Sequence, residues 1–120
     1  MTIETAVAQL RTLLGERLST ADSVRDLHGR DESWHPDAIP DAVAFPRSAK
    51  VVAEILKFAN RHRIPVTARG AGQGYVGGCV PVRGGIALSL AKMKRIREIS
   101  GNDFVAVVQP GVITAELQSA

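Results

Sequence analysis

The sequence contains a single cysteine, Cys79, and only 4% aromatic residues. One cysteine cannot form a disulfide within the chain, which is typical of a reducing compartment, and we expect the cytoplasm. This low aromatic content argues against a surface on which nucleic-acid bases could stack. The net charge of +3 is therefore interpreted as a solvated basic surface, and no nucleic-acid partner is expected. No apolar run is long enough for a membrane span, and the N-terminal stretch MTIETAVAQLRTLLGERL lacks the pattern of a signal peptide.

Two common kinds of site are missing as well. The histidines His28, His35 and His62 do not have metal-ligand spacing, so we expect no metal site. No Gly-Lys-Ser or Gly-Lys-Thr triplet occurs, which excludes the nucleotide loop that places a lysine on phosphate oxygens. A phosphate group bound by this chain would therefore need other donors.

The composition is that of a globular domain, with 45% hydrophobic and 22% charged residues in a chain of 120. Apolar residues recur at helical spacing over residues 3–14, between a capping Thr2 and Gly15, and predict a first helix. Residues 20–40 are polar and include two prolines and Trp34. This segment predicts an ordered loop.

Residues 42–68 predict a β-α-β unit. A short apolar strand at 42–45 is followed by Ser48, which is expected to cap a helix that ends near residues 60–63, and then by a strand at 65–68. Further elements are expected downstream: strands at 85–90 and 96–99, a turn at 101–103, a buried strand at 104–108 and the start of a helix at 114. The predicted fold class is therefore α/β (α+β).

The stretch TARGAGQGYVGGCVP, residues 67–81, holds five glycines directly after a predicted strand. We call residues 70–81 the glycine loop. Glycine permits positive φ and close approach of a ligand, and consecutive backbone N–H groups can hold phosphate oxygens. The pattern G-x-G-x-G is not followed by a helix, so it is not a Rossmann fingerprint and any phosphate would be held by loop amides. A tight connection between packed strands, with no ligand, is the alternative.

The segment VAFPRSAKVVAEILKFANRHRIPVTARGAGQGYVGGCVP, with GGIALSLAKMKRI and VAVVQPGV after it, resembles the first half of a known domain. This is the FAD-binding domain of the vanillyl-alcohol oxidase and p-cresol methylhydroxylase (PCMH-type) family. Within that family it looks most like the glycolate oxidase FAD-linked subunit and D-lactate dehydrogenase branch. The resemblance covers roughly residues 30–120. It implies an N-terminal helix and leading loop at 1–37, and a truncated FAD-binding domain at 38–120.

The resemblance also implies which residues bind the cofactor. The loop backbone would wrap the FAD pyrophosphate, and a Pro-Gly pair further on would approach the flavin end. In this sequence the implied residues are Arg69, Gly70, Ala71, Gly72, Gln73, Gly74, Gly77, Gly78, Pro110 and Gly111. Gln73 stands where some relatives carry a flavin-linking histidine, so non-covalent FAD is expected.

The implied reaction is hydride transfer from the carbon of a 2-hydroxy acid, such as glycolate or D-lactate, to FAD. Family members continue beyond the matching segment, and we expect the catalytic residues there, so none is assigned in this chain. Two alternatives stay open. The chain could be a flavin-binding module completed by a second polypeptide, either the missing C-terminal half or an electron-transfer subunit, or it could be an inactive fragment.

Three single residues have competing interpretations. Arg69 could neutralise phosphate charge or form a structural salt bridge. Cys79 is interpreted as a small buried hydrophobic residue in preference to a nucleophile, since no histidine lies near it in sequence. Trp34 and Asp31 resemble residues of the family's leading loop, and Trp34 is interpreted as a packing anchor.

Overall fold

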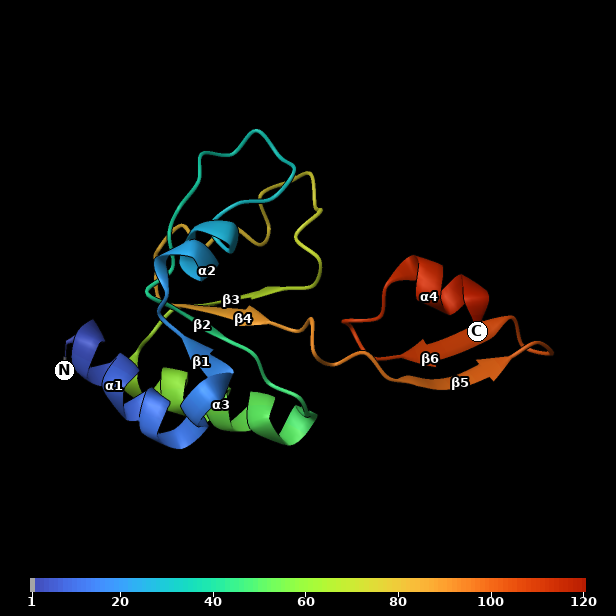
Figure 1. The fold of residues 1–120 in the computed structure, drawn as a ribbon, viewed down its shortest axis with the longest axis horizontal. Helices are drawn as coiled ribbons and strands as arrows, with labels where there is room; N and C mark the ends of the chain where they lie inside the picture. The colour runs from blue at the N-terminus through green and yellow to red at the C-terminus, as the bar shows by residue number, and fades with distance from the viewer. Residues whose placement is uncertain (1) are drawn as a thin grey trace.

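The computed structural model describes residues 2–120 and contains a four-stranded sheet in the order β1-β2-β4-β3 (Figure 1). The strands are β1 Leu18–Ser19, β2 Ala42–Ala44, β4 Ile86–Ser89 and β3 Val66–Arg69. β4 is parallel to both β2 and β3, whereas β1 is antiparallel to β2. The predicted β-α-β unit is present, with β4 inserted between its two strands.

Two capped helices cover one face of this sheet (Figure 1). α1, Ile3–Leu14, begins after Thr2, whose side chain accepts a hydrogen bond from a backbone N–H of the first turn, and ends at Gly15. α3, Ala49–His62, begins after Ser48, which caps it in the same way. Both helices and both caps were expected, because a capping side chain and an apolar stripe are local signals.

The hydrophobic core lies between these helices and the sheet. Its buried members are Leu10, Leu14, Leu18, Ala42, Ala44, Ile55, Ala59, Ile86 and Leu88. α1 and β1 thus share one core with β2 and β4, so residues from both predicted segments pack together. The division of the chain at residues 37 and 38 stays a prediction.

The prediction of a loop over residues 20–40 is wrong in part, because α2, Asp22–Leu27, lies there. α2 has six residues, no side-chain cap and no buried residue. It therefore lacks both signals by which a helix is recognised in a sequence. α2 lies on the face of the sheet opposite α1 and α3 (Figure 1). We call the following segment, residues 28–41, the Trp34 loop.

A second, two-stranded sheet extends from the rest of the molecule as an arm (Figure 1). It pairs β5, Ile96–Ser100, antiparallel with β6, Val105–Val108, and α4, Thr114–Ser119, follows. The arm gives the chain a radius of gyration of 15.4 Å, whereas a compact domain of this length has about 13.6 Å.

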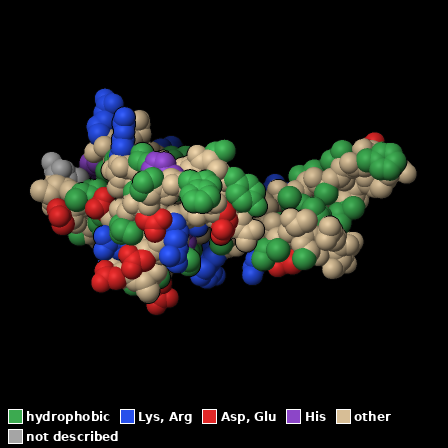
Figure 2. Space-filling view, turned by 90° about the horizontal axis from the view of Figure 1, so that it is seen from above, with side chains coloured by type: hydrophobic (Ala, Val, Ile, Leu, Met, Phe, Trp, Pro, Cys, Tyr) green, Lys and Arg blue, Asp and Glu red, His purple; other side chains and the backbone are tan. Residues whose placement is uncertain are grey.

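The expectation of a buried strand at residues 104–108 is wrong. All four residues of β6 are exposed, and Phe104 is 95% exposed at the end of the arm. Figure 2 shows hydrophobic side chains gathered on this arm. An apolar run indicates burial only where a second layer covers it, and the arm packs against no second sheet within residues 2–120.

None of the helices in the described part of the chain has the length and apolarity that a bilayer crossing requires. α3, with 14 residues, is the longest.

Candidate cofactor site

The glycine loop leaves the carboxyl end of β3 directly after Arg69. Because β2, β3 and β4 are parallel, their carboxyl ends meet at one edge of the sheet, which is where open α/β sheets bind ligands. The glycine loop then rises on the α2 side of the sheet, beside the Trp34 loop (Figure 1).

Two contacts join the glycine loop to the Trp34 loop. The backbone N–H of Glu32 donates to the carbonyl of Gly74 at 3.0 Å, and the thiol of Cys79 lies 4.0 Å from Oδ2 of Asp31. Hydrogen bonds from the side chain and backbone of Ser33 lower the pKa of Asp31, with a smaller contribution from the backbone of Gly77. Asp31 is therefore a carboxylate at neutral pH.

The glycines of the loop fall into two groups. Gly72 and Gly77 both have φ of 75°, a left-handed conformation that favours glycine. Gly70, Gly74 and Gly78 are exposed, and a Cβ added at any of them would meet no atom closer than 3.6 Å. Packing within this chain therefore does not explain why these three positions are glycine, whereas close approach of a ligand would.

The backbone N–H groups of residues 70–74 donate no hydrogen bond within residues 2–120. Within this stretch Gly70 and Gly74 are exposed and have no side chain that could cover the backbone. A run of free amide donors on exposed backbone is suited to an anion, since hydrogen bonds to a charged acceptor are roughly twice as strong as neutral ones.

A cleft of about 470 Å³ brings the loop together with the distant Pro-Gly pair predicted from sequence. Gly70, Ala71 and Gln73 line one side, and Pro110 and Gly111 line the other. A Cβ on Gly70 would lie 3.6 Å from the carbonyl oxygen of Pro110. The cleft is thus narrow at this point. The other five predicted residues do not line it.

Gly111 has a packing role in addition. Its N–H donates to the carbonyl of Met93 at 2.8 Å, and an added Cβ would overlap the carbonyl oxygen of Leu90. A glycine is therefore required here by the close backbone contact that joins the arm to the β4 edge.

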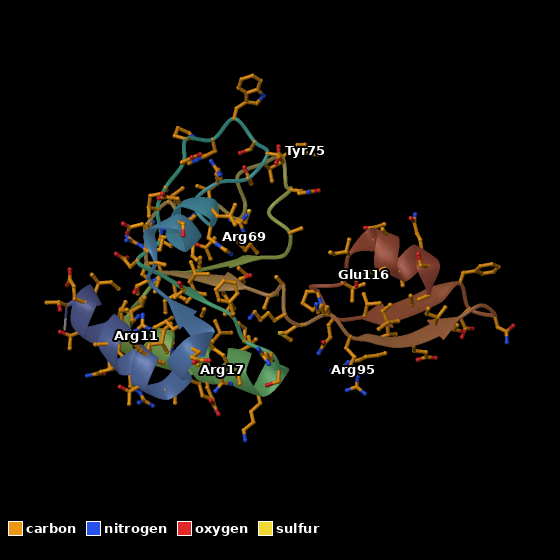
Figure 3. All side chains as sticks on the ribbon, viewed as in Figure 1. Arg11, Arg17, Arg69, Tyr75, Arg95 and Glu116 are labelled. Carbon is orange, nitrogen blue, oxygen red and sulfur yellow. The ribbon has the colours of Figure 1, made fainter. Side chains whose placement is uncertain are left out.

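Arg69 does not form the salt bridge considered from sequence. Its side chain is only 8% exposed, and Nη1 donates to the carbonyl of Arg30 at 3.1 Å. Within residues 2–120 the one ion pair closer than 4.0 Å joins Arg25 and Asp22. Figure 3 shows Arg69 beneath the two loops, whereas Tyr75 lies at the outer end of the glycine loop.

His28 has a buried position that the sequence did not indicate. It is 8% exposed, its Nδ1 lies 2.7 Å from the carbonyl of Val24, and its ring meets Phe45 edge-on. Burial lowers the pKa of His28, the hydrogen bond to Val24 opposes this, and the charge of Arg69 lowers it further. The imidazole is therefore neutral at pH 7.

The sequence did not indicate that Arg30 contacts Arg69 or that Glu32 contacts the glycine loop, and it assigned Asp31 no contact with that loop, more than thirty positions later. The Asp-x-Ser turn at Asp31 and Ser33 was the only local signal, because the other contacts use backbone groups that every residue has.

The interpretation of Trp34 as a packing anchor is wrong, because its side chain is fully exposed at 103%. Cys79 is only half-buried and contacts Asp31, so it is not the core residue expected. No group of His, Cys, Asp or Glu residues in the described part of the chain could hold a metal ion.

Curated relatives cover nearly the whole chain. It is 38% identical over 118 residues to the "Probable D-lactate dehydrogenase, mitochondrial" of Danio rerio, which covers 98% of this chain and 24% of that protein. It is 34% identical over 102 residues to "Glycolate oxidase subunit GlcD" of Bacillus subtilis, covering 85% of this chain and 22% of that protein. The chain therefore spans about a quarter of the length of these relatives.

Solved structures agree on the fold. p-Cresol methylhydroxylase with substrate bound superposes with a TM-score of 0.84 at 26% identity, covering 97% of this chain and 24% of that one. An alkyldihydroxyacetonephosphate synthase shares the fold with a TM-score of 0.84 at 20% identity, covering 99% of this chain and 24% of that one.

The model of one family, described as an FAD binding domain, matches residues 40–120, which include the whole glycine loop and the Pro110 edge of the cleft. The chain belongs to this family of FAD-binding domains, of the PCMH type predicted from its motifs.

Proposed function

We propose that this chain is the pyrophosphate-binding part of a flavin-dependent oxidoreductase that oxidises a 2-hydroxy acid of the glycolate or D-lactate type. The observation that carries the proposal is the run of free backbone N–H groups at residues 70–74, beside a cleft that Pro110 closes from the other side. When bound, FAD would supply the hydride acceptor.

The residues present fit such a cofactor. An FAD pyrophosphate has two negative charges and needs several donors on backbone that it can approach closely. Residues 70–74 offer five amides, and Gly70 and Gly74 leave the approach open. In this proposal Gly77 and Gly78 complete the turn around the phosphates, and Pro110 and Gly111 lie toward the flavin.

We propose that FAD is held non-covalently. Gln73 lines the cleft, and its amide cannot form the bond that a histidine makes to a flavin in some relatives. FAD in the loaded protein should therefore enter the supernatant after acid precipitation. Flavin that stays with the precipitate would contradict this part of the proposal.

The substrate class rests on the names of the relatives, which include D-lactate, glycolate and D-2-hydroxyglutarate enzymes. Because the chain spans about a quarter of their length, we assign no catalytic residue within it. We propose instead that a further polypeptide segment or partner subunit supplies the catalytic groups and the other wall of the cofactor site. The single Cys79 supports the cytoplasm or another reducing compartment.

The alternative, a tight connection between strands with no ligand, explains the site less well. It accounts for Gly72 and Gly77, whose φ values favour glycine, but not for Gly70, Gly74 and Gly78. It also gives the amides of residues 70–74 no acceptor within the protein.

The experiment is a titration of the ¹⁵N-labelled chain with ADP, which carries the pyrophosphate without the flavin. The amide resonances of residues 70–74 should move first, and adenosine should leave them unchanged. Gly70→Ala, which narrows the cleft toward Pro110, should weaken ADP binding about tenfold, or ~1.4 kcal/mol. Gly101→Ala is the matched control, because a Cβ there meets nothing within 4 Å.

Two outcomes would contradict the proposal. One is a set of shifts centred away from the glycine loop. The other is an equal response to ADP and adenosine, which would mean that the phosphates contribute nothing to binding.

A further inference from the structure

Arg69 is a buried cation whose guanidinium lies against Gly72 of the glycine loop and donates to the Trp34 loop. It is the last residue of β3, only 8% exposed, and its guanidinium donates to a carbonyl of the Trp34 loop, that of Arg30. We propose that Arg69 is a positioning residue, which fixes the glycine loop against the Trp34 loop through its guanidinium fork. The relevance to a cofactor rests on the proposed function, because the loop so fixed is the one assigned to pyrophosphate.

The guanidinium of Arg69 lies against the backbone of Gly72. A Cβ at position 72 would overlap Nη2 of Arg69 and lie 2.8 Å from its Cζ. The side chain of Arg69 therefore occupies the space that any other residue at position 72 would need. Arg69 and Gly72 form one unit, in which the left-handed turn at Gly72 folds the loop over the guanidinium.

Three consecutive residues of the Trp34 loop then contact the glycine loop or its base. The carbonyl of Arg30 accepts from Arg69, the carboxylate of Asp31 faces Cys79, and the N–H of Glu32 donates to Gly74 at 3.0 Å. We call this set of contacts the loop joint. Its only charged hydrogen-bond donor is Arg69, so that residue should contribute more than the neutral contacts.

A lysine should not replace Arg69. The planar guanidinium can donate from Nη1 while Nη2 lies against Gly72, whereas an ammonium is a compact, strongly hydrated group with no fork. Charge alone would be kept by lysine, and the joint would still be lost. This separates a geometric role from a purely electrostatic one.

The test measures amide hydrogen exchange by NMR in the 120-residue chain. The Glu32 amide reports on the joint, because it is donated to Gly74 across the two loops. Arg69→Met and Arg69→Lys should each speed Glu32 exchange about tenfold or more, the size expected for loss of a hydrogen bond from a charged group. The amide of Ala87, in the buried central strand β4, should change little.

Arg83→Met is the matched control. Arg83 is exposed, and in the sequence it lies in the segment that links β3 to β4. The same chemical change there should leave Glu32 exchange unaltered. The proposal is overturned if either Arg69 variant leaves the Glu32 rate unchanged. It is also overturned if Glu32 and Ala87 speed up equally, since that would indicate global unfolding.

A double-mutant comparison tests the Gly72 contact separately. Gly72→Ala should speed Glu32 exchange in the wild-type chain by displacing the guanidinium, and should add less in the Arg69→Met chain. Fully additive effects would contradict the contact.

ADP distinguishes this proposal from the proposed function. If ADP fails to shift residues 70–74 in the wild type, the pyrophosphate assignment fails and the loop joint still stands. ADP could also bind the wild type and Arg69→Lys equally well although Glu32 exchange is faster in the variant. In that case the positioning role fails and the pyrophosphate assignment stands.

Discussion

His28 couples the stability of the fold to pH. Because burial lowers its pKa below the ordinary 6.5, the unfolded chain binds a proton more readily than the folded chain near pH 6. The contribution of neutral His28 to the free energy of unfolding is therefore complete above about pH 6.5. It is lost as the pH falls toward the pKa of His28 in the folded chain. Asp31 acts in a separate, lower window, since its pKa lies below 3.8 and its contribution is lost only under stronger acid.

We predict that the free energy of unfolding falls between pH 7 and pH 5.5, with a slope no steeper than ~1.4 kcal/mol per pH unit for one proton. His28→Asn should flatten this slope, because the amide can still donate to the carbonyl of Val24 without titrating. Urea unfolding at several pH values measures it. An unchanged slope in the variant would assign the acid sensitivity to other groups.

At the residue scale the sequence predicted a candidate site, whose cofactor contacts stay a prediction, but not the separate contacts that its members make within the chain. The glycines at 70–78 and the pair at Pro110 could be predicted, because bare backbone leaves a local pattern. The roles of Arg69 and His28 could not, because each depends on a contact with a residue or charge distant in sequence. Gly72 and Gly74 are equivalent in the sequence pattern and differ only once Arg69 folds under the loop.

At the scale of elements, α3 connects β2 to β3, the strand that the glycine loop follows, and the contribution of its cap to stability should be measurable. The hydroxyl of Ser48 accepts from the N–H of Val51 at 3.3 Å. We predict that Ser48→Ala lowers the free energy of unfolding by about 1 kcal/mol, since it removes the acceptor for one orphan N–H. Ser119→Ala, in the short terminal α4, should change it by less than about 0.5 kcal/mol.

Denaturant titration decides between these outcomes. Equal effects of the two substitutions would mean that the Ser48 hydroxyl stabilises the fold no more than the hydroxyl of Ser119 does.

In the arm, one edge of strand β6 is unpaired in the described part of the chain. β6 has the sequence VAVV, pairs only with β5 within residues 2–120, and is exposed at every residue. An uncharged, exposed edge strand is prone to pair with another chain. We predict concentration-dependent self-association, and Val105→Lys should reduce it by placing a charge on the edge. Val82→Lys, at an exposed position away from the arm, should not.

Sedimentation at several concentrations measures this effect. Association that survives Val105→Lys, or that Val82→Lys reduces as strongly, would place the contact outside the arm.

The elements that the sequence predicted well share a local cause. α1 and α3 have a capping side chain and an apolar stripe within their own residues. α2 has neither, and β1 is two residues long, so both depend on neighbours for their form. The exposure of β6 could not be read from its apolar residues, because burial depends on what the rest of the molecule provides.

At the scale of the whole molecule, the proposed function gives this chain one side of a cofactor site. The cleft between Gly70 and Pro110 holds about 470 Å³ and opens to solvent beside Lys94 and Glu116. Well-formed ligand sites bury about 70 to 90% of their ligand. An extended FAD on this chain would therefore keep a large part of its surface in water, although the free amides at residues 70–74 could still hold its phosphates.

From this we predict that the 120-residue chain binds ADP and FAD with similar, weak affinity, because only the shared pyrophosphate finds donors. With FAD and an artificial electron acceptor added, it should oxidise neither glycolate nor D-lactate. Fluorescence titration measures the first and dye reduction the second. FAD binding much tighter than ADP binding would mean that the arm and Pro110 already enclose the flavin, and dye reduction would mean that a catalytic group lies within residues 2–120.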